Sequence, residues 1–299
     1  MTFGLKVVKK LQWTNVPIDK LDLKAMKVAI VGGTGGIGQG FSRMFDSRGA
    51  NVTVVGRTFR DDDLENVHFI KADLELMSEA KRVSKELAKL PLDMVIFTNG
   101  IFAATTRQRT SEGLERDMAV SYLSRLVIIR NLLPTLAETH THMLKRPRVF
   151  VVGYPGTGEL GTVEDLNSEG KYSVMQTHMN TVAGNEALVL DSARRYPEIG
   201  VYGLNPGLIK TNIRSNLLGA NSWKSWIIES IIGFWCQSTE DYARRMLPMM
   251  VSSDLDAYNP AFFNNKAQAV ESQKFTEPYV EKFIGKSEEL LEKSGVSLD

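Results

Sequence analysis

The stretch that decides the fold is KVAIVGGTGGIGQGF, residues 27–41. It opens with a short apolar run, which is typical of a buried strand. Glycines dominate the next positions, and apolar residues then recur at helical spacing from Ile37 to Phe41. A strand, a glycine-rich turn and a helix in this order predict a phosphate-binding turn, because the first N–H groups of the helix are unpaired and favour negative charge.

The rest of the chain repeats this alternation of apolar runs and helix-period segments. Further strands are predicted at 51–57, 67–74, 92–100, 147–153 and 199–207, and helices at 37–48, 78–90, 111–136, 174–195, 238–253 and 278–295. Strands that are apolar on both sides of the pleat predict a sheet covered on both faces. We therefore expect a doubly wound, mostly parallel α/β fold of the Rossmann type. No linker divides the chain, so we expect one domain over 26–299 after an N-terminal extension, 1–25.

The overall charge and composition exclude some classes of partner. The 36 basic and 35 acidic residues of the 299 give a net charge of +1, so no global attraction to nucleic acid or acidic membranes is expected. The single cysteine, Cys236, excludes an intrachain disulfide and fits a reducing compartment. Neither a signal peptide nor an apolar run of membrane-spanning length is recognised, which predicts a soluble, cytoplasmic protein.

The four histidines are scattered along the chain. Only His140 and His142 have a spacing seen in metal sites, and they follow Pro134 in a polar stretch. We therefore predict no metal site.

The end of the second predicted strand bears on which dinucleotide is bound. An acidic residue there would hold the adenosine ribose hydroxyls, whereas this chain has Arg57. A guanidinium suits a 2′-phosphate, which predicts NADP(H); the alternative is a solvated loop cation. Asp73, after the third strand, either accepts a hydrogen bond from the adenine amine or caps a helix that begins near Leu74.

With these residues in place, the chain resembles a short-chain dehydrogenase/reductase of the retinol-dehydrogenase-like branch over about residues 25–290. The motif Gly32-x-x-x-Gly36-x-Gly38 resembles the family's glycine motif, although Val31 replaces the usual threonine. KADL (71–74), TNG (98–100) and NPGLIKT (205–211) resemble the segments near the adenine and the nicotinamide. The resemblance implies these cofactor-binding residues: Gly32, Thr34, Gly36, Ile37, Gly38, Arg57, Asp73, Leu74, Asn99, Gly100, Pro206, Gly207, Ile209 and Thr211.

The family's catalytic positions carry other residues here. Its Tyr-x-x-x-Lys aligns with His178-x-x-x-Val182, its serine falls at Gly153 or Tyr154, and its helix asparagine falls at Ser121. Valine can provide neither the charge of the lysine nor its hydrogen bond to the ribose.

Three residues are therefore candidates for catalysis. His178 is either an acid or base, since imidazole titrates near neutral pH, or a satisfied polar residue. Tyr154 either donates a phenolic proton or shapes the pocket. Ser121 either holds a water molecule or packs within its helix.

The segment 216–236 is rich in large apolar residues. It is interpreted as a helix that packs on the domain, a substrate lid, a dimer contact or a membrane-surface contact; we favour a lid over a lipophilic substrate. The resemblance also implies a homodimer that pairs through the fourth and fifth helices. Three functions remain open: an atypical NADP(H)-dependent oxidoreductase, a non-redox isomerase or cyclase, and a pseudoenzyme that binds NADP(H) and a partner.

Overall fold

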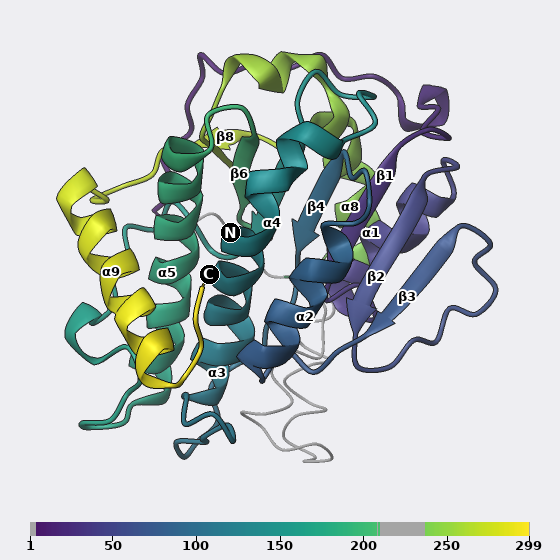
Figure 1. The fold of residues 1–299 in the computed structure, drawn as a ribbon. Helices are drawn as coiled ribbons and strands as arrows, with labels where there is room; N and C mark the ends of the chain where they lie inside the picture. Colours follow the sequence, from purple (N-terminus) through teal and green to yellow (C-terminus); the bar gives the residue numbers. More distant parts are fainter. Residues whose placement is uncertain (1–3, 208, 210–236, 299) are drawn as a thin grey trace, which may run out of the picture.

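The computed structural model describes residues 4–207, 209 and 237–298. Its centre is an eight-stranded sheet with the order β3-β2-β1-β4-β5-β6-β7-β8 (Figure 1). The pairs from β3 to β7 are parallel, and only β7 and β8 are antiparallel. The strands are β1 (Lys27–Val31), β2 (Asn51–Gly56), β3 (Val67–Lys71), β4 (Met94–Phe97), β5 (Arg148–Val152), β6 (Gly200–Leu204), β7 (Ala261–Phe263) and β8 (Ala269–Val270). The predicted doubly wound, mostly parallel α/β fold is confirmed, as a single domain.

Helices cover both faces of this sheet. On one face α1 (Gly36–Asp46) packs against α8 (Thr239–Val251). On the other lie α2 (Met77–Leu87), α4 (Ser124–Thr139), α5 (Val174–Arg195) and α9 (Glu277–Lys293), which form the near layer in Figure 1. Alternate residues of β1 point to the two layers: Val28 and Ile30 join one buried cluster, and Ala29 and Val31 join the other. This burial on both sides explains why the strand is apolar throughout.

The helix predicted over 111–136 begins later and is not uniform. It starts as α3 (Arg116–Met118), continues as a π-helical turn (Ala119–Leu123), and then becomes α4. The chain first makes a turn at Gly113, whose φ is +85°, and the Glu115 carboxylate then accepts a hydrogen bond from Met118 N at 2.8 Å. The start at 111 was therefore wrong, because a turn and an N-cap precede the helix.

The other predicted helices begin and end within three residues of the observed helices, and α5 matches the predicted 174–195. Short 3₁₀ turns lie at Ile18–Lys20, Val163–Asp165 and Ser253–Ala257. None of the helices in the described ranges is both long enough and apolar enough to cross a membrane.

The first residues of the chain run beside the last strands. Val7 forms an antiparallel bridge with Val270, and the indole N–H of Trp13 donates to the Ala267 carbonyl at 3.0 Å. The segment 4–25 is thus attached to the antiparallel edge of the sheet.

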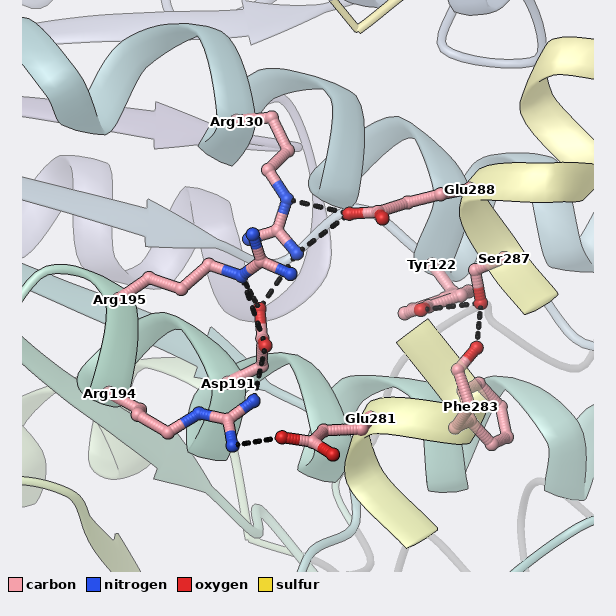
Figure 2. Close-up of polar contacts among 9 residues, drawn as sticks. All are labelled: Tyr122, Arg130, Asp191, Arg194, Arg195, Glu281, Phe283, Ser287 and Glu288. Atoms are coloured by element: carbon pink, nitrogen blue, oxygen red, sulfur yellow. Dashed lines mark hydrogen bonds and ion pairs between the residues drawn. The ribbon is translucent and has the colours of Figure 1, made fainter. Parts of the chain in front are cut away.

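A buried ionic network ties α9 to α4 and α5 (Figure 2). The Arg130 guanidinium lies 2.7 Å from a carboxylate oxygen of Asp191 and 2.9 Å from one of Glu288. Beside it, the Tyr122 hydroxyl donates to Ser287 Oγ at 2.8 Å, which in turn donates to the Phe283 carbonyl. The face that α4 and α5 turn away from the sheet is therefore covered by a helix of the same chain.

Candidate functional site

The carboxyl ends of β1, β4, β5 and β6 meet at one edge of the sheet, the edge toward which the arrowheads of β2, β3 and β4 point in Figure 1. In open parallel sheets this edge is where ligands bind. The glycine turn, the loop after β4, the loop after β5 and the segment 205–209 all leave the sheet here. Helix α3 lies at the same edge.

The glycine turn has the form of an anion cradle. Gly35 is the N-cap of α1, makes no side-chain cap, and would place a Cβ with nothing within 4 Å among the described residues. No acidic residue occupies the first turn of α1. The first N–H groups of this helix therefore face open space and suit a pyrophosphate.

Two other glycines are required by packing. Gly32 has a φ of +87°, and a Cβ there would lie 2.4 Å from Asn99 N. A Cβ on Gly38 would lie 2.4 Å from both Gly32 O and Thr98 Oγ1. The glycine turn therefore packs closely against the end of β4. Ile37 directly precedes Gly38 in the first turn of α1.

The end of β2 lies beside this turn. A Cβ on Gly56 would meet Thr34 Cγ2 at 2.6 Å, so the Thr34 side chain covers the last residue of the strand. Arg57 follows and is exposed. A hydroxyl and a guanidinium thus lie close to where the adenosine ribose of a dinucleotide would bind.

Asp73 does not cap a helix. Its Oδ1 accepts a hydrogen bond from Glu75 N at 3.2 Å, and α2 begins only at Met77. The first N–H groups of α2 are bound instead by the Glu112 carboxylate, at 2.5 Å from Met77 N. The capping interpretation was therefore wrong, because a distant loop provides the cap. Asp73 is exposed and Leu74 is buried.

Asn99 and Gly100 form the loop after β4. The Asn99 amide donates to the Val120 carbonyl at 2.6 Å and to Ser124 Oγ at 3.0 Å, while its Oδ1 is buried without a partner in the described part of the chain. A Cβ on Gly100 would lie 3.5 Å from Ser121 Oγ. This loop therefore rests on the π-helical turn.

His178 is held by a buried carboxylate. Its Nδ1 lies 2.8 Å from Oδ2 of Asp117, whose side chain is 0% exposed, whereas the imidazole is 17% exposed. The ring stacks on Phe102, with centroids 3.9 Å apart. The imidazole is thus fixed on one side and accessible on the other.

Ser121 also binds Asp117. Its Oγ donates to Oδ1 of Asp117 at 2.6 Å and accepts from Ile101 N at 3.0 Å. The backbone carbonyl of Ser121 accepts from the Asn185 amide at 2.9 Å. The structure therefore brings His178 and Ser121 together on one carboxylate, and a π-helical turn of this kind is often found at functional sites.

A buried arginine lies behind these residues. Arg125 is 3% exposed and donates to the Val152 carbonyl at 2.7 Å, to Asn185 Oδ1 at 2.8 Å and to the Asn99 carbonyl. Burial lowers its pKa to about 9, and the negative charge of Asp117 acts in the opposite sense. The guanidinium is therefore still a cation at neutral pH.

Tyr172 and Glu115 lie near the same carboxylate. The Tyr172 hydroxyl donates to the Ala104 carbonyl at 2.6 Å. Its pKa is raised to about 12 by burial and by the charges of Glu115 and Asp117. Burial likewise raises the pKa of Glu115 to about 7, and Asp117 adds to the shift. Neither group is suited to carry a negative charge close to Asp117.

Tyr154 lies in the loop after β5 and is 38% exposed. Within the described residues, no contact of its side chain joins it to His178 or Ser121. The loop is anchored by Glu186, whose Oε2 accepts from Gly156 N at 2.9 Å and whose Oε1 accepts from Ser272 Oγ at 2.6 Å. Burial raises the pKa of Glu186 to about 7.

The segment after β6 is only partly described. Pro206 is buried, and Gly207 has a φ of +64° with its N–H bound to Asn205 Oδ1 at 3.1 Å. Ile209 bridges Gln237. Thr211 and the predicted lid 216–236 lie outside the described residues.

Within residues 4–207, 209 and 237–298, no three or more His, Cys, Asp or Glu side chains are grouped so that they could hold a metal ion. The rings of His140 and His142 pack edge to face, with centroids 4.1 Å apart. His140 Nδ1 lies 3.9 Å from Oδ1 of Asp93.

Comparison with known proteins assigns the family. Residues 26–143 match the family model described as short chain dehydrogenase. An uncharacterized oxidoreductase of Saccharomyces cerevisiae is 49% identical over 287 residues, which cover 94% of this chain and 93% of that protein. The chain belongs to the short-chain dehydrogenase/reductase family. A short-chain dehydrogenase/reductase of Penicillium rubens is 25% identical over 221 residues, covering 70% of this chain and 64% of that one.

The fold agrees with that of a solved structure. The Pseudomonas aeruginosa RhlG/NADP active-site complex superposes with a TM-score of 0.59 over 81% of this chain and 95% of its own, at 18% identity. At that identity the likeness concerns the fold alone.

Two residues of the site were missed from the sequence, Asp117 and Arg125. A signal was present, since the polar residues Asp117, Ser121 and Arg125 recur at every fourth position of the predicted helix. This spacing places polar side chains on one face of a helix.

Proposed function

We propose that this short-chain dehydrogenase/reductase is an NADP(H)-dependent oxidoreductase that acts on a hydrophobic carbonyl or alcohol, with His178 as the proton-transfer group. One observation carries the proposal. A partly exposed imidazole, bound through Nδ1 to a buried carboxylate, lies at the sheet edge onto which an open glycine turn also faces. The two parts that a reductase needs, a cradle for the hydride donor and a proton donor, are thus on the same edge.

The cofactor residues of the proposal are those implied by the resemblance. The exposed cradle at Gly35 and the unpaired N–H groups of α1 fit a pyrophosphate. Thr34 against Gly56, followed by the exposed Arg57, supports a phosphorylated ribose over an unmodified one. A bound reduced nicotinamide provides the hydride for this chemistry. That the solved neighbour is an NADP complex agrees with this choice.

In carbonyl reduction, His178 gives the proton that completes the reaction. The carbonyl carbon gains a hydride, and the oxygen gains a proton from the imidazolium to become an alcohol. The oxidised nicotinamide and a neutral imidazole are left. In alcohol oxidation the neutral imidazole takes up the proton.

Ser121 and Tyr154 have lesser roles in the proposal. The Ser121 hydroxyl is bound to Asp117 and Ile101 N, so we assign it to holding the carboxylate. Tyr154 is exposed, and its phenol is available to a substrate from the side of β5.

The hydrophobic substrate is inferred from apolar side chains near His178. Phe102 stacks on the imidazole, and Met175, three residues before it in α5, is 58% exposed. The exposed side chains of Met175 and Tyr154 give the carboxyl edge of the sheet an apolar character. The lid at 216–236 stays a prediction.

Four further expectations stay predictions: the retinol-dehydrogenase-like branch, the cytoplasmic location, the division at residues 25 and 26, and the homodimer. The position of α9 bears on the predicted homodimer. A second copy that paired through the outer face of α4 and α5 would have to displace α9, which is tied down by Arg130 and Tyr122 (Figure 2). Light scattering that gives the mass of one chain would contradict a homodimer.

A second candidate function is a pseudoenzyme that binds NADP(H). It is favoured by Val182, which is 6% exposed and occupies the position of the family's lysine. The test is NADPH consumption by the full-length protein with a panel of hydrophobic ketones and aldehydes. Turnover that falls at least about tenfold in His178→Ala supports the oxidoreductase. Tight NADPH binding without turnover supports the pseudoenzyme, and a product isomeric with its substrate supports a non-redox enzyme.

A further inference from the structure

We propose that Asp117 is a positioning residue that fixes His178 in the tautomer with a proton on Nδ1, which leaves Nε2 as the atom that exchanges a proton with the substrate. The inference deepens the function proposed above and rests on it.

The tautomer follows from the hydrogen-bonding partners. Asp117 Oδ2 is 2.8 Å from His178 Nδ1, and an ionised carboxylate can only accept. The proton of a neutral imidazole must then be on Nδ1, so the lone pair is on Nε2. The buried carboxylate of Asp117 cannot reach substrate itself, because its side chain is 0% exposed.

The carboxylate is itself held by Ser121 at Oδ1 and by His178 at Oδ2. Its Oδ1 accepts from Ser121 Oγ at 2.6 Å, and Ser121 Oγ accepts from Ile101 N, in the loop after β4. Phe102, the next residue of that loop, stacks on the imidazole. The same loop therefore orients both members of the pair, which gives the fixed geometry that proton transfer requires.

The charge of Asp117 is balanced by Arg125. Among the residues that the structure describes, this guanidinium donates to the neutral oxygens of Val152, Asn185 and Asn99, and the carboxylate whose charge acts on it is Asp117. A buried cation without a direct ion pair is costly unless a nearby anion compensates it. Arg125 thus makes a buried carboxylate tolerable beside an imidazole that must lose its own charge during reduction.

The alternative is that Asp117 only stabilises the fold. A matched control within the chain separates the two roles. Asp93 is also 0% exposed and also lies near a histidine, with Oδ1 3.9 Å from His140 Nδ1. It precedes β4, at the opposite edge of the sheet, where it binds Thr141 and Lys27 N. Asp93→Asn therefore reproduces the loss of a buried carboxylate away from the site.

The experiment measures the ring-nitrogen NMR signals of ¹⁵N-histidine in the full-length protein, with His178 assigned from His178→Ala. In spectra whose signals show the neutral ring, we expect the proton of wild-type His178 on Nδ1. A proton on Nε2 in the wild type would overturn the proposal, and this result does not depend on any Asp117 variant. We expect Asp117→Asn to shift the population toward the other tautomer, and Asp93→Asn to leave it unchanged.

The kinetic readout is the split between kcat and KM. For Asp117→Asn we expect kcat to fall at least about tenfold with the KM for the carbonyl within about threefold, because the interaction acts on proton transfer and not on substrate binding. A variant that folds and keeps the wild-type kcat and tautomer overturns the role of Asp117. Absence of turnover in the wild type counts against the proposed oxidoreductase, whereas the tautomer, read without substrate, bears on Asp117 alone.

Discussion

The side chain of Thr34 lies against Gly56, so closely that a Cβ on Gly56 would be 2.6 Å from Thr34 Cγ2. The glycine turn after β1 and the end of β2 are thus one surface, and Arg57 is the first residue beyond it. The diphosphate and the adenosine ribose of a dinucleotide would then be bound by neighbouring segments of the chain.

The choice of dinucleotide can be tested at Arg57. In Arg57→Ser we expect the Kd for NADPH to rise about tenfold or more, since a charge-assisted contact to phosphate is lost, while the Kd for NADH stays the same. Fluorescence titration of both cofactors measures this. Arg244→Ser, which removes an exposed arginine on α8, is the control and should change neither value. An unchanged preference for NADPH over NADH in Arg57→Ser would show that Arg57 is a solvated loop cation that does not contact the cofactor.

The cradle can be tested at Gly35. Its φ is −168°, an extended conformation that any residue adopts, and its Cβ would meet nothing within 4 Å. Gly35→Ala should therefore keep the thermal stability of the protein yet weaken NADPH binding, because the methyl group would enter the space for the pyrophosphate. Gly285→Ala, another open position, lies in α9 and should raise stability by about 0.5–1 kcal/mol without changing binding. Equal NADPH affinity in both variants contradicts the cradle.

The altered catalytic positions can be tested by exchange. The double change His178→Tyr with Val182→Lys is expected to create or raise carbonyl reduction, because it restores the two residue types that the family uses. His178→Tyr with Val182→Met is the matched control, since it adds length at the buried position 182 without charge. If the lysine variant behaves like the methionine variant, the alignment of 178 and 182 with the family's pair is wrong.

Glu186 should lower the stability of the protein as the pH rises from about 4.5 to about 7. Its carboxyl has a pKa raised by burial from 4.5 to about 7. A raised carboxyl pKa in the folded state means that this contribution to stability is complete below about pH 4.5 and is lost as the pH rises to about 7. In Glu186→Gln we expect little change at pH 5 and a gain of up to about 3 kcal/mol at pH 8.

Denaturant unfolding at the two pH values measures this difference. Gln can still accept from Gly156 N and donate to Ser272 Oγ, so the anchor of the loop after β5 is kept. Glu198→Gln, at an exposed position, should alter neither value. A loss of stability at pH 8 in Glu186→Gln would show that the ionised carboxylate is favourable there.

Much of the fold could be predicted from the periodicity of apolar residues, and the elements that were missed or misplaced have physical explanations. Strands β1, β2, β4, β5 and β6 were recognised because burial on both faces makes them apolar runs, whereas β3 at the edge of the sheet has no fully buried residue. Strands β7 and β8 have only three and two residues, too few to show a period, and they form because β6 offers an edge to pair with. The late start of α3 depends on the turn at Gly113, which the sequence alone did not distinguish from the helix.

For the site, the sequence identified His178 and Ser121 but not what joins them. Asp117 is one acidic residue among 35, and the sequence does not show that it is wholly buried. Its importance depends on the approach of α5 to α3, a tertiary contact. Arg125 was missed for the same reason, since arginines are rarely buried. The alignment of Val182 with the family's lysine rested on the resemblance alone, and the burial of Val182 agrees with an uncharged residue at this position.

The measurement that tests the account most directly is the single-turnover rate of NADPH oxidation with a hydrophobic carbonyl, compared between the wild type and His178→Ala at saturating NADPH. The account predicts oxidation by the wild type, a rate at least about tenfold lower in the variant, and the same NADPH affinity in both. Oxidation at equal rates in the two proteins would contradict it, because the proton would then come from another group.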